Sequence, residues 1–195
     1  MTGLFGGAFD PPHNGHVALA RAALDHFALE RLVVAPAGEP PLKDGPVGAD
    51  AETRLRLAFA AFADLPHTEI SRIDVDRPQP AYSHDTVRVA RERWGEIIFL
   101  IGADRLTDFR HWKAPDEVLR YARLGVATRP GIEPAELEDV LDALAHPERV
   151  ELFEIPRVDV SSRDLRRRVA EHEPTDGLVP PPVAALITEF GLYRH

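Results

Sequence analysis

The amino-acid sequence predicts an α/β fold in which helices cover both faces of a doubly wound parallel sheet. Short apolar stretches typical of strands alternate along the chain with longer stretches typical of helices. The most apolar stretch, EIIFLIG at 96–102, indicates a central strand buried on both faces. A chain of 195 residues has room for one such domain with a sizeable core. We therefore expect residues 1–195 to form a single domain.

Six stretches are expected to form the strands of this sheet. TGLFG at 2–6 is a short apolar stretch that ends in glycine, and RLVVAPA at 31–37 is stopped by Pro36. ISRIDV at 70–75 alternates apolar and polar residues, which is the pattern of a strand. The remaining strands are expected at 96–102, 123–129 and 150–155.

Seven stretches between and after the strands are expected to be helical. The first, at 14–28, carries its apolar residues at helical spacing. The others are expected at 51–63, 83–94, 115–120, 134–145, 162–170 and 183–190. Because crossovers between parallel strands are right-handed, this order gives a doubly wound sheet that binds ligands beyond the carboxyl ends of its strands. The loops at that edge are 6–16, 36–48, 102–112 and 156–166.

Composition limits the partners and the chemistry. The formal net charge of −9 argues against non-specific binding to nucleic acid or to an anionic membrane, because both favour a basic surface. No apolar stretch approaches the ~20 residues that span a bilayer, and no leader is evident at Met1, so we expect a cytoplasmic protein. The absence of cysteine excludes disulfides, a thiolate nucleophile and a cysteine zinc site. The sequence leaves homo-oligomerisation open.

The first loop, GGAFDPPHNGH at 6–16, lies directly between an expected strand and an expected helix. Gly6 and Gly7 let the backbone approach a phosphate, and the new helix offers unpaired amides and the positive end of its dipole. His13 and His16 are three apart across the helix start, so both imidazoles can donate to phosphate oxygens. The alternatives are an ordinary turn with two exposed histidines, or a zinc pair for which no third ligand is evident.

A basic segment at 157–168 carries five arginines against two aspartates and so opposes the overall charge. Ser161 or Ser162 can cap a helix here, and Arg166 lies about one turn further on. Helix amides and this guanidinium can therefore converge on one polyphosphate, although a capped and solvated basic helix is the alternative. Two neighbouring arginines point elsewhere around the helix and are expected at the surface: Arg167 and Arg168.

The first loop closely resembles GGTFDPxHxGH, the signature of the HxGH nucleotidyltransferases, and specifically of the bacterial nicotinate-nucleotide adenylyltransferases. The resemblance covers nearly the whole chain and is carried further by APAGEPPLK at 35–43, PAYSHDTV at 80–87, FLIGADRLTDFRHW at 99–112, RPG at 129–131, VSSRDLRRRV at 160–169 and GLYR at 191–194. It implies a Rossmann-like nucleotidyltransferase fold. The C-terminal part, about 156–195, is then expected to form a small helical subregion that completes the ATP site.

The resemblance implies an adenylyltransferase of NAD biosynthesis that joins nicotinate mononucleotide to the AMP part of ATP, giving nicotinate adenine dinucleotide and pyrophosphate. An acceptor phosphate oxygen would attack the α-phosphorus in line, while the protein aligns and neutralises two anions. Mg²⁺ is expected to be held mainly by ATP, with no dedicated metal site on the protein. The expected catalytic residues are His13, His16 and Arg166.

The resemblance also assigns residues to each substrate. Trp112 matches a tryptophan that stacks on the pyridine ring, Ser83 a position whose backbone holds the nicotinate carboxylate, and Lys43 a residue that approaches the phosphates. Gly102 and Asp104 are expected at the adenosine half of ATP, although Asp104 is equally an ordinary helix cap. The full expected ATP site is Gly6, Gly7, Ala8, Phe9, His13, His16, Gly102, Asp104, Ser161, Ser162 and Arg166.

Four positions depart from the family pattern. Ala8, Ser83 and Arg163 each replace a threonine, and Leu42 replaces a histidine. Because Ala8 and Arg163 remove hydroxyls near the expected phosphates, a non-catalytic nucleotide-binding protein is one alternative. Another is a transferase of the same fold that uses nicotinamide mononucleotide or a different phosphate acceptor.

Overall fold

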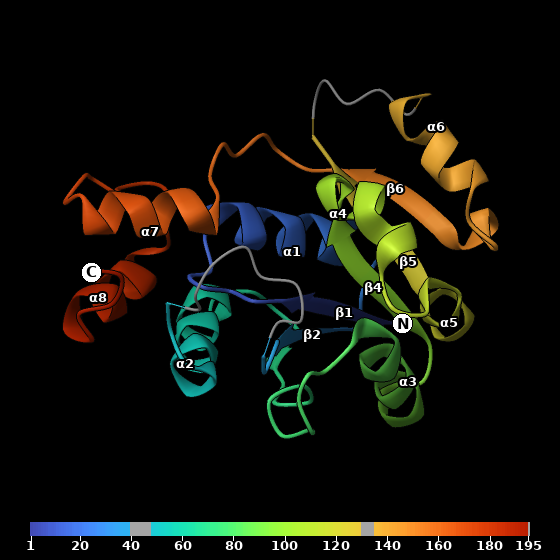
Figure 1. Ribbon diagram of the computed structural model, residues 1–195, viewed down its shortest axis with the longest axis horizontal. Coiled ribbons are helices and arrows are strands. Elements are labelled where there is room, and N and C mark those ends of the chain that lie inside the picture. Colours follow the sequence, from blue (N-terminus) through green and yellow to red (C-terminus); the bar gives the residue numbers. More distant parts are fainter. Residues whose placement is uncertain (40–47, 130–134, 195) are drawn as a thin grey trace.

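The computed structural model describes residues 1–39, 48–129 and 135–194 (Figure 1). Six parallel strands form one sheet in the order β3-β2-β1-β4-β5-β6. Their bounds are β1 (Thr2–Gly7), β2 (Arg31–Pro36), β3 (Thr68–Ile70), β4 (Ile97–Gly102), β5 (Arg123–Thr128) and β6 (Val150–Glu154). The chain starts in the middle of the sheet, winds outward to β3 and then returns to build the other half from β4. This confirms the predicted doubly wound α/β fold.

Helices cover both faces of the sheet. Those whose buried residues join the core on one face are α1 (Asn14–His26), α2 (Ala51–Phe62), α7 (Ser162–Ala170) and α8 (Pro181–Glu189). Those on the other face are α3 (Ser83–Trp94), α4 (Ala103–Asp108), α5 (Pro115–Tyr121) and α6 (Ala135–Asp142). Short 3₁₀ helices follow α4 and α6, at Phe109–His111 and Pro147–Arg149. In the part of the chain that the structure describes, no helix is long and apolar enough to cross a membrane.

The strands explain why both cores form. Successive side chains of a strand point to opposite faces, so Leu4 enters one core and Phe5 the other. In the same way Phe99 of β4 lies on the α3 and α4 side, whereas Ile98 and Leu100 lie on the α1 and α2 side. Because every one of these residues is buried, β4 needs apolar side chains throughout, as its sequence predicted.

The stretch at 70–75 is not a strand, so this prediction was wrong; β3 is the shorter stretch Thr68–Ile70. The chain turns after it, and the apolar–polar alternation has another cause. Ile73 is buried in the core. The neighbouring Asp74 is also buried, and its Oδ1 is satisfied there by a hydrogen bond from the Thr86 hydroxyl at 2.7 Å. The pattern therefore reflects burial within a turn.

The other predicted elements lie where expected, with ends shifted by three residues or fewer, but one helix was missed. Residues 103–108 were expected to belong to a loop and instead form α4. Its buried residues, Ala103 and Leu106, belong to the core on that face, where α4 contacts β4, β5 and α6. A stretch of six residues is too short for helical periodicity to be recognised in the sequence.

One buried side chain ties together the loops at the carboxyl ends of β1 and β2. Arg54 of α2 is 1% exposed, and its Nη1 donates to the carbonyls of Ala8 at 3.0 Å and Ala37 at 2.6 Å. Its Nη2 donates to the Gly38 carbonyl, and its Nε donates to that of Ala49 at 3.2 Å. A single guanidinium therefore holds three separate segments at the edge where ligands bind in such sheets.

Replacing Arg54 by methionine should lower the free energy of unfolding by about 3 kcal/mol, because buried carbonyls would lose charge-assisted hydrogen bonds. Urea unfolding measures this change. Arg56→Met is the matched control, since Arg56 is an exposed residue of the same helix, and it should change stability by less than about 1 kcal/mol. Equal losses in the two variants would contradict the clamping role of Arg54.

Candidate functional site

His13 and His16 hold each other at the start of α1 through a reciprocal capping box. The His13 backbone N–H donates to Nδ1 of His16 at 3.1 Å, and the His16 backbone N–H donates to Nδ1 of His13 at 3.3 Å. The two rings are stacked, with centroids 3.7 Å apart and an interplanar angle of 22°. Since both Nδ1 atoms accept hydrogen bonds, each neutral ring carries its proton on Nε2. The pair therefore provides two Nε2–H donors, and the hydrogen bonds to Nδ1 orient the ring that carries each donor.

Both imidazoles are neutral at pH 7. Burial, followed by the positive charge of Arg129, lowers the pKa of His13 from 6.5 to about 4. Burial also lowers the pKa of His16 well below its usual value, with smaller contributions from His13 and Arg105. Neutral imidazoles donate hydrogen bonds without the desolvation cost of a buried cation. Arg105 and Arg129 were not singled out in the sequence, although Arg129 directly follows β5 and Arg105 lies in the first turn of α4, which follows β4.

The glycine between the histidines is needed for their stacking. A Cβ at Gly15 would lie 3.1 Å from both Cε1 and Nδ1 of His13, so a larger residue would push the ring away. On the other side, His16 packs against the edge of Phe9, with ring centroids 5.1 Å apart. Phe9 is itself 1% exposed, and its φ of 49° is a left-handed conformation that few non-glycine residues adopt. Tight packing therefore fixes the orientation of both imidazoles.

The glycines at the end of β1 make room for aromatic rings. A Cβ at Gly7 would lie 3.0 Å from Cζ of Phe9, and one at Gly6 would lie 3.3 Å from Cε2 of Phe99. From the sequence, these two glycines were expected to let a phosphate approach the backbone closely. The structure gives each of them a packing reason as well, and the two residues remain partly exposed at the end of the strand.

The late basic helix lies against the first loop, although the two are about 150 residues apart. The Ser162 hydroxyl donates to the Pro11 carbonyl at 2.8 Å, and Nη1 of Arg166 donates to the Asp10 carbonyl at 2.7 Å. Ser161 is the N-cap of α7, because its Oγ accepts the backbone N–H of Asp164 at 3.1 Å. In Figure 1, α7 and α1 lie end to end, and the first residues of the two helices are neighbours.

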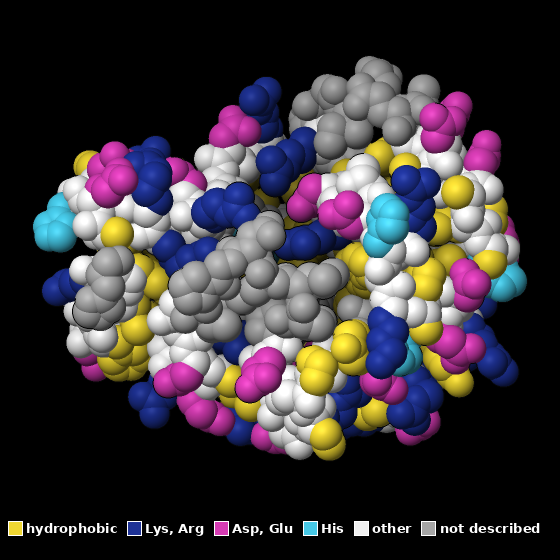
Figure 2. Space-filling model, viewed as in Figure 1, with side chains coloured by type: hydrophobic (Ala, Val, Ile, Leu, Met, Phe, Trp, Pro, Cys, Tyr) yellow, Lys and Arg dark blue, Asp and Glu magenta, His cyan; other side chains and the backbone are white. Residues whose placement is uncertain are grey.

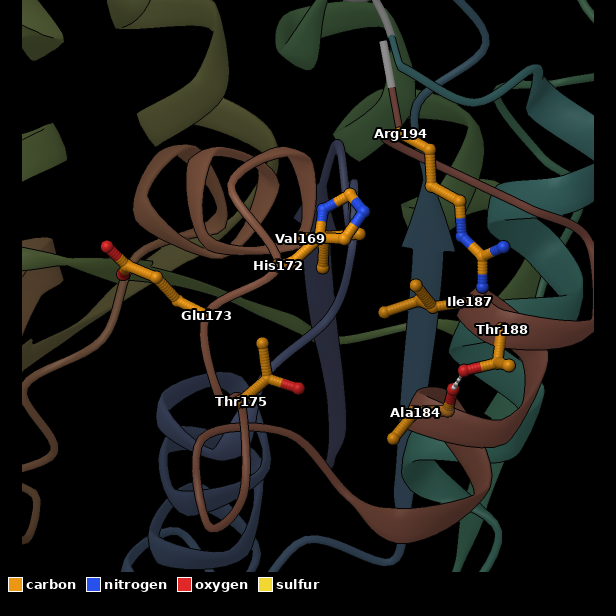
Figure 3. Close-up of a pocket in the computed structure, with 8 residues that line it drawn as sticks. All are labelled: Val169, His172, Glu173, Thr175, Ala184, Ile187, Thr188 and Arg194. Atoms are coloured by element: carbon orange, nitrogen blue, oxygen red, sulfur yellow. Dashed lines mark hydrogen bonds between the residues drawn. The ribbon is translucent and has the colours of Figure 1, made fainter.

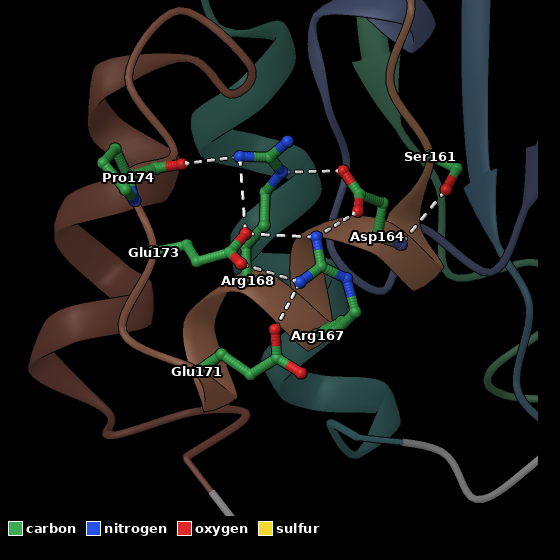
Figure 4. A network of polar contacts seen from close by, with 7 residues as sticks. All are labelled: Ser161, Asp164, Arg167, Arg168, Glu171, Glu173 and Pro174. Carbon is green, nitrogen blue, oxygen red and sulfur yellow. Dashed lines mark hydrogen bonds and ion pairs between the residues drawn. The ribbon is translucent and has the colours of Figure 1, made fainter.

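Two arginines of α7 are neutralised within their own segment (Figure 4). Arg167 pairs with Asp164 at 2.9 Å, with Glu173 at 3.0 Å and with Glu171. Arg168 pairs with the same aspartate at 2.7 Å and with Glu173 at 3.6 Å. Their guanidinium groups thus form ion pairs with the helix and with the turn that follows it, in agreement with the surface position predicted for them. Arg163 is exposed as well.

Asp10 is a buried junction that sequence reasoning missed. Its carboxylate is 1% exposed, and it accepts the backbone N–H of Gly48 at 3.0 Å and that of Ala49 at 3.2 Å. The hydroxyl of Tyr193 donates to the same carboxylate at 2.8 Å. These partners lie about 40 and 180 residues further along the chain, so no local pattern reveals them. The sequence offered one hint of this contact: Asp10 and Tyr193 each lie in a family motif, GGAFDPPHNGH and GLYR, in which neither residue was given a role.

Two of the residues expected to hold the acceptor, Ser83 and Trp112, have chain neighbours that contact each other. Lys113 Nζ lies 4.0 Å from the centre of the Tyr82 ring, which joins the segment after Trp112 to the start of α3 at Ser83. Trp112 is only partly exposed, because it packs on Phe99 and Phe109 with ring centroids 6.4 Å and 5.2 Å away. The side chain expected to stack on the pyridine ring therefore packs partly on the core and remains partly exposed.

Two further predictions concern the loop after β4 and the loop after β2. Gly102 is the N-cap of α4, and no side-chain hydrogen bond caps that helix, so Asp104 is not a cap. Asp104 is instead largely exposed, with Arg105 at 3.8 Å. Lys43 lies outside the described residues, as does Leu42.

Positive charge gathers at this edge of the sheet. Figure 2 shows Lys and Arg side chains around the hollow at the centre of the face, between α7 and α4. Residues 1–39, 48–129 and 135–194 contain no group of three His, Asp or Glu side chains that could hold a metal ion. A separate cavity of about 390 Å³ lies between α7 and α8, lined by His172, Thr188 and Arg194 among others (Figure 3). The paired histidines do not line it.

Acidification should destabilise the protein through His13. The unfolded chain binds a proton on this imidazole near pH 6.5 and the folded protein only near pH 4, so the unfolded state is protonated first as the pH falls. Between about pH 7.5 and pH 5 this difference should cost about 2 kcal/mol. His13→Asn, whose amide oxygen can replace Nδ1 as the cap, should lose about 2 kcal/mol less over that interval in urea unfolding. Parallel pH dependences would contradict a neutral imidazole.

Comparison with known proteins gives the same picture over the whole chain. The family model described as cytidylyltransferase-like matches residues 4–168. A probable nicotinate-nucleotide adenylyltransferase of Roseiflexus sp. (strain RS-1) is 44% identical, over 98% of this chain and 97% of the relative. Another, from Thermomicrobium roseum, is 38% identical over 98% of this chain and 91% of the relative.

Comparison with a solved structure supports the same fold. The Plasmodium falciparum nicotinic acid mononucleotide adenylyltransferase complexed with NaAD superposes with a TM-score of 0.78, covering 98% of this chain and 96% of that chain. At 16% identity this likeness shows the fold alone. The relatives at 38% and 44% identity each match over 98% of this chain. The chain therefore belongs to the nicotinate-nucleotide adenylyltransferases, within the cytidylyltransferase-like family.

Proposed function

We propose that this enzyme transfers the AMP part of ATP to the phosphate of nicotinate mononucleotide. An oxygen of the acceptor phosphate bonds to the α-phosphorus of ATP, the bond from that phosphorus to the bridging oxygen breaks, and pyrophosphate leaves with the electron pair. The observation that carries the proposal is the neutral, reciprocally capped pair of His13 and His16 beside α7. Two relatives, at 44% and 38% identity, are named for this reaction.

The two Nε2–H groups supply hydrogen bonds where negative charge develops. Because packing and the capping box already orient both rings, donation to phosphate oxygens needs little rearrangement during the reaction. Arg166 adds a guanidinium from α7, and the charges of Arg105 and Arg129 lie near enough to act on the imidazoles. Together these groups would stabilise the triphosphate and the leaving pyrophosphate.

The remaining ATP contacts are proposed from position. Gly6, Gly7 and Ala8 would face the nucleotide through their backbone, and so would Phe9, whose ring is buried. The partly exposed end of β4 at Gly102, with Asp104 beyond it, would lie along the adenosine. The C-terminal subregion, with the α7 start at Ser161 and Ser162, would close the phosphate side.

Trp112, Ser83 and Lys43 remain the proposed acceptor residues. The partly exposed indole would stack on the pyridine ring, and the start of α3 would offer backbone N–H groups to the carboxylate. Mg²⁺ would enter with ATP, because phosphate oxygens are the ligands it prefers, and it would neutralise charge on the leaving pyrophosphate. A cytoplasmic location belongs to the same proposal.

His16→Asn should lower kcat by about 10²- to 10³-fold at saturating ATP and acceptor. The amide oxygen of asparagine can occupy the place of Nδ1 and preserve the cap, so this change removes mainly the Nε2–H donor. Pyrophosphate release measures turnover. His26→Asn is the matched control, because His26 lies on the same helix at its opposite end, and its turnover should stay within about twofold of wild type. Near-normal turnover of His16→Asn would rule out the role given to this donor.

Nicotinate mononucleotide should be the preferred acceptor in a panel assayed with ATP and Mg²⁺. A carboxylate is satisfied by N–H donors and positive neighbours, whereas an amide requires a donor and an acceptor together. The measurement is kcat/KM for pyrophosphate release with nicotinate and nicotinamide mononucleotides in parallel. Preference for the amide would assign a different acceptor to the same fold. ATP binding with no release for any acceptor would indicate a non-catalytic protein.

A further inference from the structure

The end of the chain reaches the base of the first loop through Tyr193. This residue is 8% exposed, its ring lies in the core beneath α1 and α2, and its hydroxyl donates to Oδ1 of Asp10 at 2.8 Å. Asp10 stands three residues before His13 and is separated from Tyr193 by 183 residues. A buried contact of this length in sequence is made only when the C-terminal segment is folded onto the loop.

Asp10 in turn determines where Arg166 lies. The Arg166 guanidinium donates to the Asp10 backbone carbonyl at 2.7 Å, and its Nη1 lies 3.9 Å from the Oδ2 atom of the same residue. Tyr193 and Arg166 also pack together over Gly48. A Cβ added there would lie 2.4 Å from Cε1 of the tyrosine and 3.2 Å from Cδ of the arginine. The three side chains therefore form one contiguous unit below the phosphate site.

We propose that Tyr193 is a positioning residue for adenylyl transfer: its hydroxyl orients Asp10, which holds Arg166 and the first loop in the arrangement that binds the triphosphate of ATP. This inference rests on the proposed ATP site. Tyr193 has no route to the reacting atoms of its own, because it is buried and acts through the carboxylate.

The chemistry of the contact supports an orienting role. Burial, followed by the nearby Asp10 carboxylate, raises the pKa of Tyr193 well above its usual value, so the hydroxyl remains a donor throughout the working pH range. Two backbone N–H groups from the segment before α2 also donate to the carboxylate. The tyrosine hydroxyl instead comes from the C-terminal subregion, as does Arg166, whose Nη1 lies 3.9 Å from the same carboxylate.

Tyr193→Phe isolates this contact, because phenylalanine keeps the packed ring and removes only the hydroxyl. We expect the KM for ATP to rise about five- to tenfold and kcat to fall by up to about tenfold, with the KM for nicotinate mononucleotide within about twofold of wild type. A purely structural role would reduce the fraction of active enzyme and leave the KM for ATP unchanged. That result would overturn the inference.

Tyr121→Phe is the matched control, since Tyr121 ends α5 and has no contact with Asp10 among the hydrogen bonds described; its kinetics should equal those of wild type. Asp10→Asn weakens the same hydrogen bond from the other side and should raise the KM for ATP in the same direction. The double variant should then show much less than the product of the two single effects. Independent, multiplying effects would overturn the inference.

His16→Asn, measured in the same assay, distinguishes this inference from the proposed function. Normal turnover of His16→Asn would mean that the proposed phosphate site itself is wrong. Impaired His16→Asn together with an unchanged KM for ATP in Tyr193→Phe would leave the proposed function standing and refute only the role of Tyr193.

Discussion

The contact between α7 and the first loop is the interaction on which the site depends. Two hydrogen bonds carry it, from the Ser162 hydroxyl to the Pro11 carbonyl and from Arg166 to the Asp10 carbonyl. Both acceptors are backbone atoms of the loop that leads into His13. Because they are backbone atoms, the loop must keep one conformation for α7 to dock. The starts of two helices are thereby brought to the same edge of the sheet, where their amides and side chains can act on one anion.

Charge is distributed so that this edge differs from the rest of the surface. The protein carries a net charge of −9, yet arginines from α4, α7 and the end of β5 lie around the paired histidines. Acidic side chains of the segment that follows α7 neutralise Arg167 and Arg168, while Arg166 turns to the loop. Neutral imidazoles beside these cations can donate hydrogen bonds without adding repulsion between like charges.

Most of the fold could be predicted from sequence because its central strands are buried on both faces and its longer helices are periodic. The failures occurred where tertiary contacts override a local pattern. Asp74 is polar yet buried, since Thr86 donates a hydrogen bond to it, and so a turn resembled an alternating strand. The six residues of α4 were too few to show a period, and the burial of Ala103 and Leu106 in the core over β4 and β5 decided the outcome.

The sequence by itself determined the order of most strands and helices along the chain, the position of the glycine and histidine loop, and the family to which its motifs belong. These features depend on residues close together in the chain, so their spacing can be recognised directly. Only the tertiary structure decided which imidazole nitrogen carries the proton, that Ser161 rather than Ser162 caps α7, and that Asp10 meets Tyr193. Each of these depends on the direction of a hydrogen bond or on partners far apart in the chain, and neither is encoded in local spacing.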